Sequence, residues 1–234
     1  MEVEFYRRTL KGFRKGLTIF DVGANQGYKT DIFVRLGAKV IAIEPDEFNQ
    51  NVLNESFLRM RLVKKPVTIV GKAVSDQNGI QEMWVDEPGS AKNTLNVKWV
   101  ETLRHDASRF GKNLSFANVK TVHTVTLDDL IRLHGQPFYI KIDVEGYECC
   151  VLRGLHHPVP FISFEVNLPE FESEAIQCID LLHQIHSGGQ FNYAPDCYGS
   201  MALENWVGKA KFLGFLDTCR ERCIEVYWKS SKGQ

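Results

Sequence analysis

Short apolar runs alternate with amphipathic stretches along most of the chain after residue 16. Runs such as 17–20, 39–44 and 67–70 have the length and the β-branched content of strands, whereas the segments between them carry apolar residues at helical spacing. Alternating strands and helices are typical of βαβ units, which build a mainly parallel sheet. The pattern therefore predicts an α/β fold.

Glycine, proline and capping residues set the expected bounds of these elements. Gly37 ends the first helix of this pattern, Pro45 breaks the second strand, and Thr126 is the expected N-cap of a short helix that Gly135 ends. The expected strands are 17–20, 39–44, 67–70, 80–85, 119–125, 138–144, 161–166, 191–194 and 223–228, and the expected helices are 28–36, a polar-faced helix reaching about Met60, 126–131, 146–152, 169–185 and 206–215.

A long polar segment, 86–118, separates two strands of the middle part and contains Gly89, Ser90, Lys92 and Asn93. Loops of this length are usually functional or disordered. Two interpretations stay open, namely a lid on the substrate side of a site and a surface insertion without a role.

Length and composition fit one soluble domain of mixed class. We expect a basic helical extension at 1–16, followed by one α/β domain at 17–234. The net charge of −1 offers no positive field for nucleic acid, and no apolar run approaches the ~18 residues of a membrane span. The first residues carry charges instead of an apolar stretch, so the expected location is the cytoplasm.

The six cysteines lie in the second half, at 149, 150, 178, 197, 219 and 223, without the C-x2-C spacing of zinc sites. Reduced structural thiols are the favoured interpretation, and we assign no metal ligands. The alternative is a metal held by Cys219 and Cys223, one helical turn apart, with help from Cys197 or His183.

The turn at 21–27 follows the first strand and precedes a helix, as in nucleotide-binding loops where glycines let backbone N–H groups approach a ligand. Its sequence departs from the dinucleotide fingerprint, because Asp21 ends the strand and Asn25 replaces a central glycine. A carboxylate opposes a pyrophosphate but attracts the ammonium and sulfonium groups of S-adenosylmethionine. Asp21 thus favours this methyl donor over NAD, whereas Glu44, ending the next strand, suits the ribose hydroxyls of either ligand.

The strand at 138–144 carries Lys141 and Asp143 on one face, where Glu165 of the next strand is expected to join them. Lys141 pairs with Glu165 or with Asp143, since a buried charge is costly without a partner. Asp143 stands at the carboxyl end of its strand, where ligands gather in open α/β sheets. Glu148 begins a helix, so its expected role is structural.

Several motifs, in this order along the chain, resemble the FkbM-like methyltransferases over residues 17 to about 167. They are DVGANQG, IAIEPD, KAVSD at 72–76, TLDDL at 126–130, KIDVEGYE and VLRGL. The resemblance implies a single-domain, Rossmann-like class I methyltransferase fold: a mostly parallel seven-stranded sheet with an antiparallel last strand, helices on both faces and extra strands in the middle.

The resemblance also implies roles for individual residues. The donor S-adenosylmethionine would contact the turn and the end of the second strand, its adenine would lie near Ala73 and Val74, and Asp143 would lie beside its methionine end. The implied donor-binding residues are Asp21, Gly23, Ala24, Asn25, Gly27, Glu44, Ala73, Val74 and Asp143. Similar proteins methylate hydroxyl groups of sugars or polyketide-like molecules, which points to a small-molecule or glycan acceptor.

A hydroxyl acceptor must lose its proton during methylation, and our hypothesis is that Asp143 or Glu145 accepts it, or that these acids hold a divalent metal. Two other classes of function stay open. One is an NAD-dependent oxidoreductase, supported by Glu44 and opposed by Asp21. The other is a non-catalytic domain that binds an adenosine compound or a protein partner.

Overall fold

The computed structural model describes residues 2–58, 66–106, 114–195 and 199–230. Its strands are β1 (Thr18–Val22), β2 (Lys39–Ile43), β3 (Val67–Val70), β4 (Ala73–Val74), β5 (Gly79–Val85), β6 (Asn118–Val125), β7 (Tyr139–Ile142), β8 (Phe161–Asn167), β9 (Gln190–Ala194) and β10 (Cys223–Lys229). Its helices are α1 (Glu2–Thr9), α2 (Tyr28–Leu36), α3 (Glu47–Ser56), α5 (Val97–His105), α6 (Leu127–His134), α7 (Glu148–Arg153), α8 (Glu172–Ile185) and α9 (Lys209–Leu216).

Seven strands form the main sheet in the order β3-β2-β1-β7-β8-β10-β9. Strands β3, β2, β1, β7 and β8 run parallel to their neighbours, whereas β10 is antiparallel to both β8 and β9. The predicted α/β fold and the antiparallel last strand are therefore confirmed. The chain reverses its direction across the sheet between β1 and β7, and ligands of open α/β sheets bind at such a switch point, outside the carboxyl ends of the strands.

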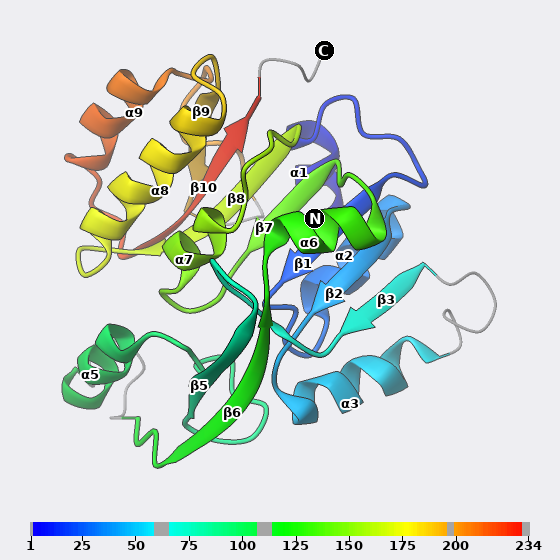
Figure 1. Cartoon of the computed structure of the whole chain (residues 1–234). Coiled ribbons are helices and arrows are strands. Elements are labelled where there is room, and N and C mark those ends of the chain that lie inside the picture. The colour runs from blue at the N-terminus through cyan, green and yellow to red at the C-terminus, as the bar shows by residue number, and fades with distance from the viewer. Residues whose placement is uncertain (1, 59–65, 107–113, 196–198, 231–234) are drawn as a thin grey trace.

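Helices cover both faces of the main sheet (Figure 1). On one face, α6, α7, α8 and α9 pack against a core that includes Phe20, Ile140 and Phe164. On the other, α1 and α2 pack against Ile19 and Tyr139, while α3 covers the sheet edge near β3. The alternation of side chains along each strand produces these two cores, because successive residues point to opposite faces.

A second, three-stranded sheet of order β4-β6-β5 projects from the main sheet, with α5 beside it (Figure 1). Strands β5 and β6 are antiparallel, and the short β4 runs parallel to β6. The extra strands in the middle are thereby confirmed. Residues 73 and 74, expected in a loop, form β4 because β6 supplies a partner for their backbone groups.

Several predicted bounds were wrong. Helix α7 begins at Glu148 instead of residue 146, since Gly146 has φ of +89°. Helices α8 and α9 begin three residues later than expected, at Glu172 and Lys209. For α9 the reason is Val207, whose backbone pairs with Phe191 as an isolated β-bridge and so stays extended.

The N-terminal segment contains helix α1, which packs against the main sheet. Phe5 and Tyr6 are buried in the core of the main sheet, while Arg7 and Arg8 are exposed. Among the described residues, no helix combines the length and the apolar character that crossing a membrane requires. The expected end of the second helix near Met60, the thiol of Cys197 and residues 107–113 of the long polar segment lie outside the described residues.

Candidate active site

A cleft of about 700 Å³, including its open mouth, lies at the carboxyl ends of β1, β2 and β7. Its size is that of a typical small-molecule site. The lining residues come from the predicted turn, from the end of β2, from β4 and from the loop after β7; they include Gly23, Asn25, Glu44, Ala73, Val74, Asp143, Glu145 and Tyr147. Most of the residues assigned from the sequence to donor binding therefore meet in one cleft.

The glycine turn brings two loops into close contact. Gly23 has φ of +79°, and a Cβ atom added to it would lie 1.8 Å from the carbonyl oxygen of Asp143. Gly27 (φ +92°) caps α2, where a Cβ atom would lie 2.6 Å from Leu53. Left-handed backbone and absent side chains are thus both required here. Asn25 also has positive φ, at 47°, a conformation that asparagine tolerates better than most residues.

Glu44 is buried at the wall of the cleft, with its carboxylate held by backbone. Its two oxygens accept hydrogen bonds from the N–H groups of Asn25 and Asp46, each at 2.8 Å. Burial raises the pKa of Glu44 to about 7, although these two hydrogen bonds act to lower it. Asn49 also forms a side-chain hydrogen bond with the Glu44 carboxylate. A carboxylate offers about four lone-pair sites, so this rigidly held group can still accept a hydrogen bond from a hydroxyl group.

Asp21 lies behind the turn and does not line the cleft. Its side chain is fully buried and accepts a hydrogen bond of 2.6 Å from the hydroxyl of Thr30 in α2. The parallel register of β1 and β7 pairs it with Lys141. Burial raises the pKa of Asp21, against the lowering effect of Lys141. A direct contact with a donor stays a prediction; in the structure this carboxylate joins β1 to α2.

Lys141 and Asp143 form an ion pair, with 2.7 Å between Nζ and Oδ2. The lysine side chain is 3% exposed and that of Asp143 is 35% exposed. Burial lowers the pKa of Lys141, but the charges of Asp143, Glu225 and Asp21 outweigh it and raise that pKa. Burial likewise raises the pKa of Asp143, and Lys141 outweighs it, so that this pKa is lowered. Of the two predicted partners of Lys141, the structure pairs it with Asp143.

Glu145 is engaged by the long polar segment. One carboxylate oxygen lies 3.1 Å from Nζ of Lys92, and the other accepts a hydrogen bond of 3.0 Å from the indole of Trp99. The hydroxyl of Thr94 donates to the backbone carbonyl of Glu145 at 2.8 Å. Glu145 has φ of +55°, which is unusual for a non-glycine residue. These contacts hold a strained loop and the start of the long polar segment together.

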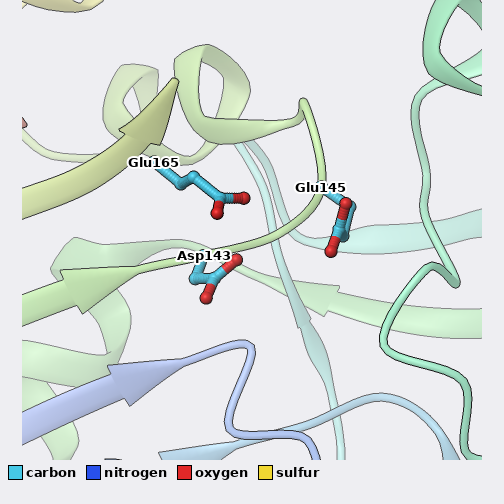
Figure 2. A group of neighbouring side chains, drawn as sticks. All are labelled: Asp143, Glu145 and Glu165. Carbon is cyan, nitrogen blue, oxygen red and sulfur yellow. The ribbon is translucent and has the colours of Figure 1, made fainter. Parts of the chain in front are cut away.

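Glu165 completes a group of three carboxylates with Asp143 and Glu145 (Figure 2). The register of β7 and β8 pairs Ile142 with Phe164, which places Glu165 beside residue 143. The three residues offer carboxylate oxygens within 4.8 Å of one another, a spacing that also suits a metal ion. Lys141 and Lys92 already form ion pairs with two of these acids. The spacing of the carboxylates is therefore the single observation among the described residues in favour of a metal, and we assign none.

Glu148 has a structural position, as its place in the sequence suggests. It is buried, and one carboxylate oxygen accepts hydrogen bonds from the N–H groups of Val144 (3.0 Å) and Gly146 (3.3 Å). Burial raises the pKa of Glu148 to about 8. The side chain therefore fixes the loop that carries Asp143 and Glu145.

The thiols described by the structure are free. Cys223 lies beside Glu165, with its Sγ 3.1 Å from a carboxylate oxygen, and Cys219 packs against the main core. The favoured interpretation of reduced thiols agrees with this arrangement. In the alternative metal site, Cys219 would be a ligand, but it packs against the main core. Cys197, another proposed ligand, lies outside the described residues.

Sequence reasoning missed the partners of Glu145. Lys92 stood in the segment considered as a lid, but nothing along the chain linked it to Glu145, and Trp99 carried no signal at all. The contact of Asn93 was also not foreseen: its amide donates to Asp46 at 2.8 Å and ties the same segment to the N-terminus of α3. Contacts between segments so far apart in sequence depend on the fold.

Comparison with known proteins agrees with this geometry. The model of the FkbM methyltransferase domain matches residues 21–189. Among solved structures, the chain is similar to methyltransferase FkbM from Methylobacillus flagellatus KT, with a TM-score of 0.57 and 15% identity over 96% of this chain and 47% of that one. The chain thus spans about half the length of that protein, and the likeness concerns the fold.

Two further structures have TM-scores below 0.5, and we base no conclusion on them. They are precorrin-6y C5,15-methyltransferase from Geobacter metallireducens GS-15 (TM-score 0.46, 12% identity, 98% of this chain and 85% of that one) and a TehB-like SAM-dependent methyltransferase from Corynebacterium glutamicum ATCC 13032 Kitasato (TM-score 0.47, 9% identity, 98% and 87%). No curated protein matches the sequence.

The family match begins within β1, at the predicted turn, and ends just after α8, so it includes the whole cleft. It covers well over half of the chain, and the fold is that of class I methyltransferases. The predicted family is confirmed: the chain belongs to the FkbM methyltransferase family.

Proposed function

We propose that this chain transfers the methyl group of S-adenosylmethionine to a hydroxyl group of a sugar, glycan or polyketide-like acceptor. The observation that carries the proposal is Glu44, a rigid and buried carboxylate that faces the cleft beside the glycine turn. The same residue type at the end of the second strand holds the ribose of adenosine ligands in Rossmann-like folds.

The residues that line the cleft support its use as the donor site. Glu44 would accept hydrogen bonds from the ribose hydroxyls, and the apolar side chains of Ala73 and Val74 would pack against the adenine. The turn would approach the methionine part through the backbone of Gly23 and Asn25, since Gly23 has no side chain to separate them. When bound, the donor supplies an electrophilic methyl group and a thioether leaving group.

Charge favours this donor over NAD. The end of the cleft near Gly23 carries Asp143, whose side chain is 35% exposed and whose pKa is lowered, so that it is ionised at neutral pH. Lys141 compensates part of this charge, but the exposed part of the carboxylate still favours an ammonium or sulfonium group over a pyrophosphate. The charge that the sequence suggested for Asp21 would thus be supplied to the cleft by Asp143.

The protein's contribution to methyl transfer would be orientation. Holding an acceptor oxygen in line with the methyl carbon is worth about 7–11 kcal/mol in well-oriented reactions. Lys92 and Trp99 hold Glu145, and Asn93 anchors the same segment to Asp46. We propose that this part of 86–118 covers the cleft on the substrate side, because Ser90 and Leu95 line it.

Thermal-shift titration tests the donor. We expect S-adenosylhomocysteine to stabilise the chain and NAD to leave its Tm unchanged. Stabilisation by NAD without stabilisation by S-adenosylhomocysteine would support an oxidoreductase instead.

Radiolabelled S-adenosylmethionine then tests the acceptor, with a panel of glycosides, hydroxylated polyketides and amines. We expect the hydroxyl compounds to acquire the label as methyl ethers and the amines to stay unlabelled. Exclusive labelling of amines would contradict O-methylation and leave the donor assignment intact.

A further inference from the structure

A second cavity, of about 690 Å³, lies next to the donor cleft. Its walls include Glu2, Tyr28, Lys29, Lys141, Glu165 and Cys223, and it shares Asp143 with the cleft. A third hollow, lined by Gly23, Asn25, Tyr28 and Asp143, joins the two. The three hollows therefore adjoin one another between the glycine turn and Glu165.

The three grouped acids differ in their partners. Asp143 is paired with Lys141 at 2.7 Å, and Glu145 with Lys92 at 3.1 Å. Within the described parts of the chain, Glu165 has no cation within ion-pair distance; its neighbours are the thiol of Cys223 at 3.1 Å and the amide of Asn167 at 3.4 Å. Among the described residues, Glu165 is thus the member of the group that has no positively charged side chain in direct contact.

We infer that an acceptor hydroxyl binds in this second cavity and that Glu165 takes its proton as the methyl group is transferred. The inference rests on the proposed function and assigns it a base that differs from both Asp143 and Glu145. The acceptor O–H bond breaks and its proton goes to the Glu165 carboxylate, while the oxygen lone pair forms the new C–O bond. The S–CH₃ bond breaks, and its electron pair stays on sulfur.

Electrostatics support this choice of base. Burial and then the charges of Asp143 and Glu145 raise the pKa of Glu165 well above its usual value. Glu148 acts in the same direction, whereas the positive charge of Lys92 interacts with Glu165. A carboxylate with raised basicity accepts a proton more readily than Asp143, whose pKa Lys141 holds down. The thiol of Cys223 stays protonated, since burial and Glu165 raise its pKa.

The test compares Glu165→Gln with the exposed control Glu221→Gln, which precedes β10. Three readouts are used: affinity for S-adenosylhomocysteine by calorimetry, methyl transfer to the hydroxyl acceptor found in the panel as a function of pH, and alkylation of Cys223 by iodoacetamide without any acceptor. Calorimetry isolates the donor, so a failure of the proposed function appears as lost donor binding in the wild type.

We expect Glu165→Gln to keep donor affinity within about threefold and to lose about 10²–10⁴-fold in transfer rate, the usual value of a general base. The wild-type rate should rise with pH around a midpoint above that of an ordinary glutamate, and the variant should lack this rise. Glu165→Asp should recover part of the rate, and Cys223 should be alkylated faster in Glu165→Gln.

Two results would overturn the inference. The first is a Glu165→Gln enzyme that transfers methyl groups within threefold of the wild type with the same pH profile. The second, which requires no acceptor, is a rate of Cys223 alkylation that is the same in Glu165→Gln and in the wild type. That result would mean that the Glu165 carboxylate does not lie against the Cys223 thiol in this cavity.

Discussion

The candidate site has a donor half, which lies in the cleft, and an acid half, which extends from the cleft to the second cavity. Different interactions set the shape of the two halves. In the donor half, formed by Gly23, Asn25, Glu44 and Val74, the backbone sets the shape, through positive φ angles and N–H groups that hold one carboxylate. In the acid half, formed by Lys92, Lys141, Asp143, Glu145 and Glu165, charged side chains set the shape through ion pairs. Steric changes should therefore dominate in the donor half and changes of charge in the acid half.

The largest effect is expected in the acid half, from Lys141→Met. The change keeps the bulk of the side chain but leaves Asp143, Asp21 and Glu225 without their shared buried cation. Removing one partner of a buried pair costs about 3–5 kcal/mol. Urea unfolding should show this loss, whereas Lys92→Met should lose less, because its side chain is 28% exposed and the indole of Trp99 still donates to Glu145. Equal losses would contradict the distinction between the two lysines.

The donor half should respond most strongly to Gly23→Ala. Gly16→Ala is its matched control, because Gly16 also has positive φ (+90°) but has nothing within 4 Å of an added Cβ atom. We expect about 1–2 kcal/mol of destabilisation for the control, from the backbone conformation alone. Gly23→Ala should lose about 3 kcal/mol and abolish binding of S-adenosylhomocysteine, since the Cβ atom meets the carbonyl of Asp143. Similar stability and affinity in both variants would show that the two loops do not touch.

Glu148→Gln should change the pH dependence of stability. The pKa of Glu148 is raised from 4.5 to about 8 in the folded chain, so the folded state binds more protons than the unfolded state between these values. The free energy of unfolding therefore falls as pH rises through this window. Glutamine does not ionise, and its amide oxygen still accepts the two N–H groups.

Urea unfolding at about pH 5 and about pH 8.5 measures this effect. The wild type should lose about 3–4 kcal/mol between the two conditions, because the pKa difference spans about three units within this window, and the variant should not show this loss. The same slope in both proteins would mean that folding does not raise the pKa of Glu148.

The smallest effect is expected for Glu44→Gln, in affinity for the donor. Loss of a hydrogen bond to a charged group costs about 1.5 kcal/mol, or roughly tenfold in Kd for S-adenosylhomocysteine. Calorimetry should find Glu148→Gln and the exposed control Glu47→Gln unchanged, although Glu148 is as buried as Glu44 and also accepts two backbone N–H groups. Equal losses for Glu44 and Glu148 would show a general effect on folding.

The donor half was the more predictable from sequence, for a physical reason. Its determinants are local: a strand, Gly23 and Gly27, a helix, and Glu44 at the end of the next strand. Helix α2 and strand β3 were predicted with their observed bounds, because glycine and periodicity mark them. The sequence did not reveal that Asp21 faces Thr30 behind the turn, since both orientations fit the same pattern.

The acid half was predictable only in part. Alternation along β7 placed Lys141 and Asp143 on one face, and the order of the strands added Glu165. The sequence pattern did not decide which of the two acids pairs with Lys141. It also did not predict the contacts of Lys92 and Trp99 with Glu145. Those contacts depend on how the three-stranded sheet and α5 pack against the loop after β7, which no local pattern encodes.

A crystal structure with S-adenosylhomocysteine tests the central claim most directly. We predict the ribose hydroxyls within hydrogen-bond distance of the Glu44 carboxylate, the adenine against Val74, and the sulfur next to Asp143 on the side of the second cavity. A ligand bound elsewhere, or a ribose turned away from Glu44, would contradict the assignment of this cleft to the methyl donor.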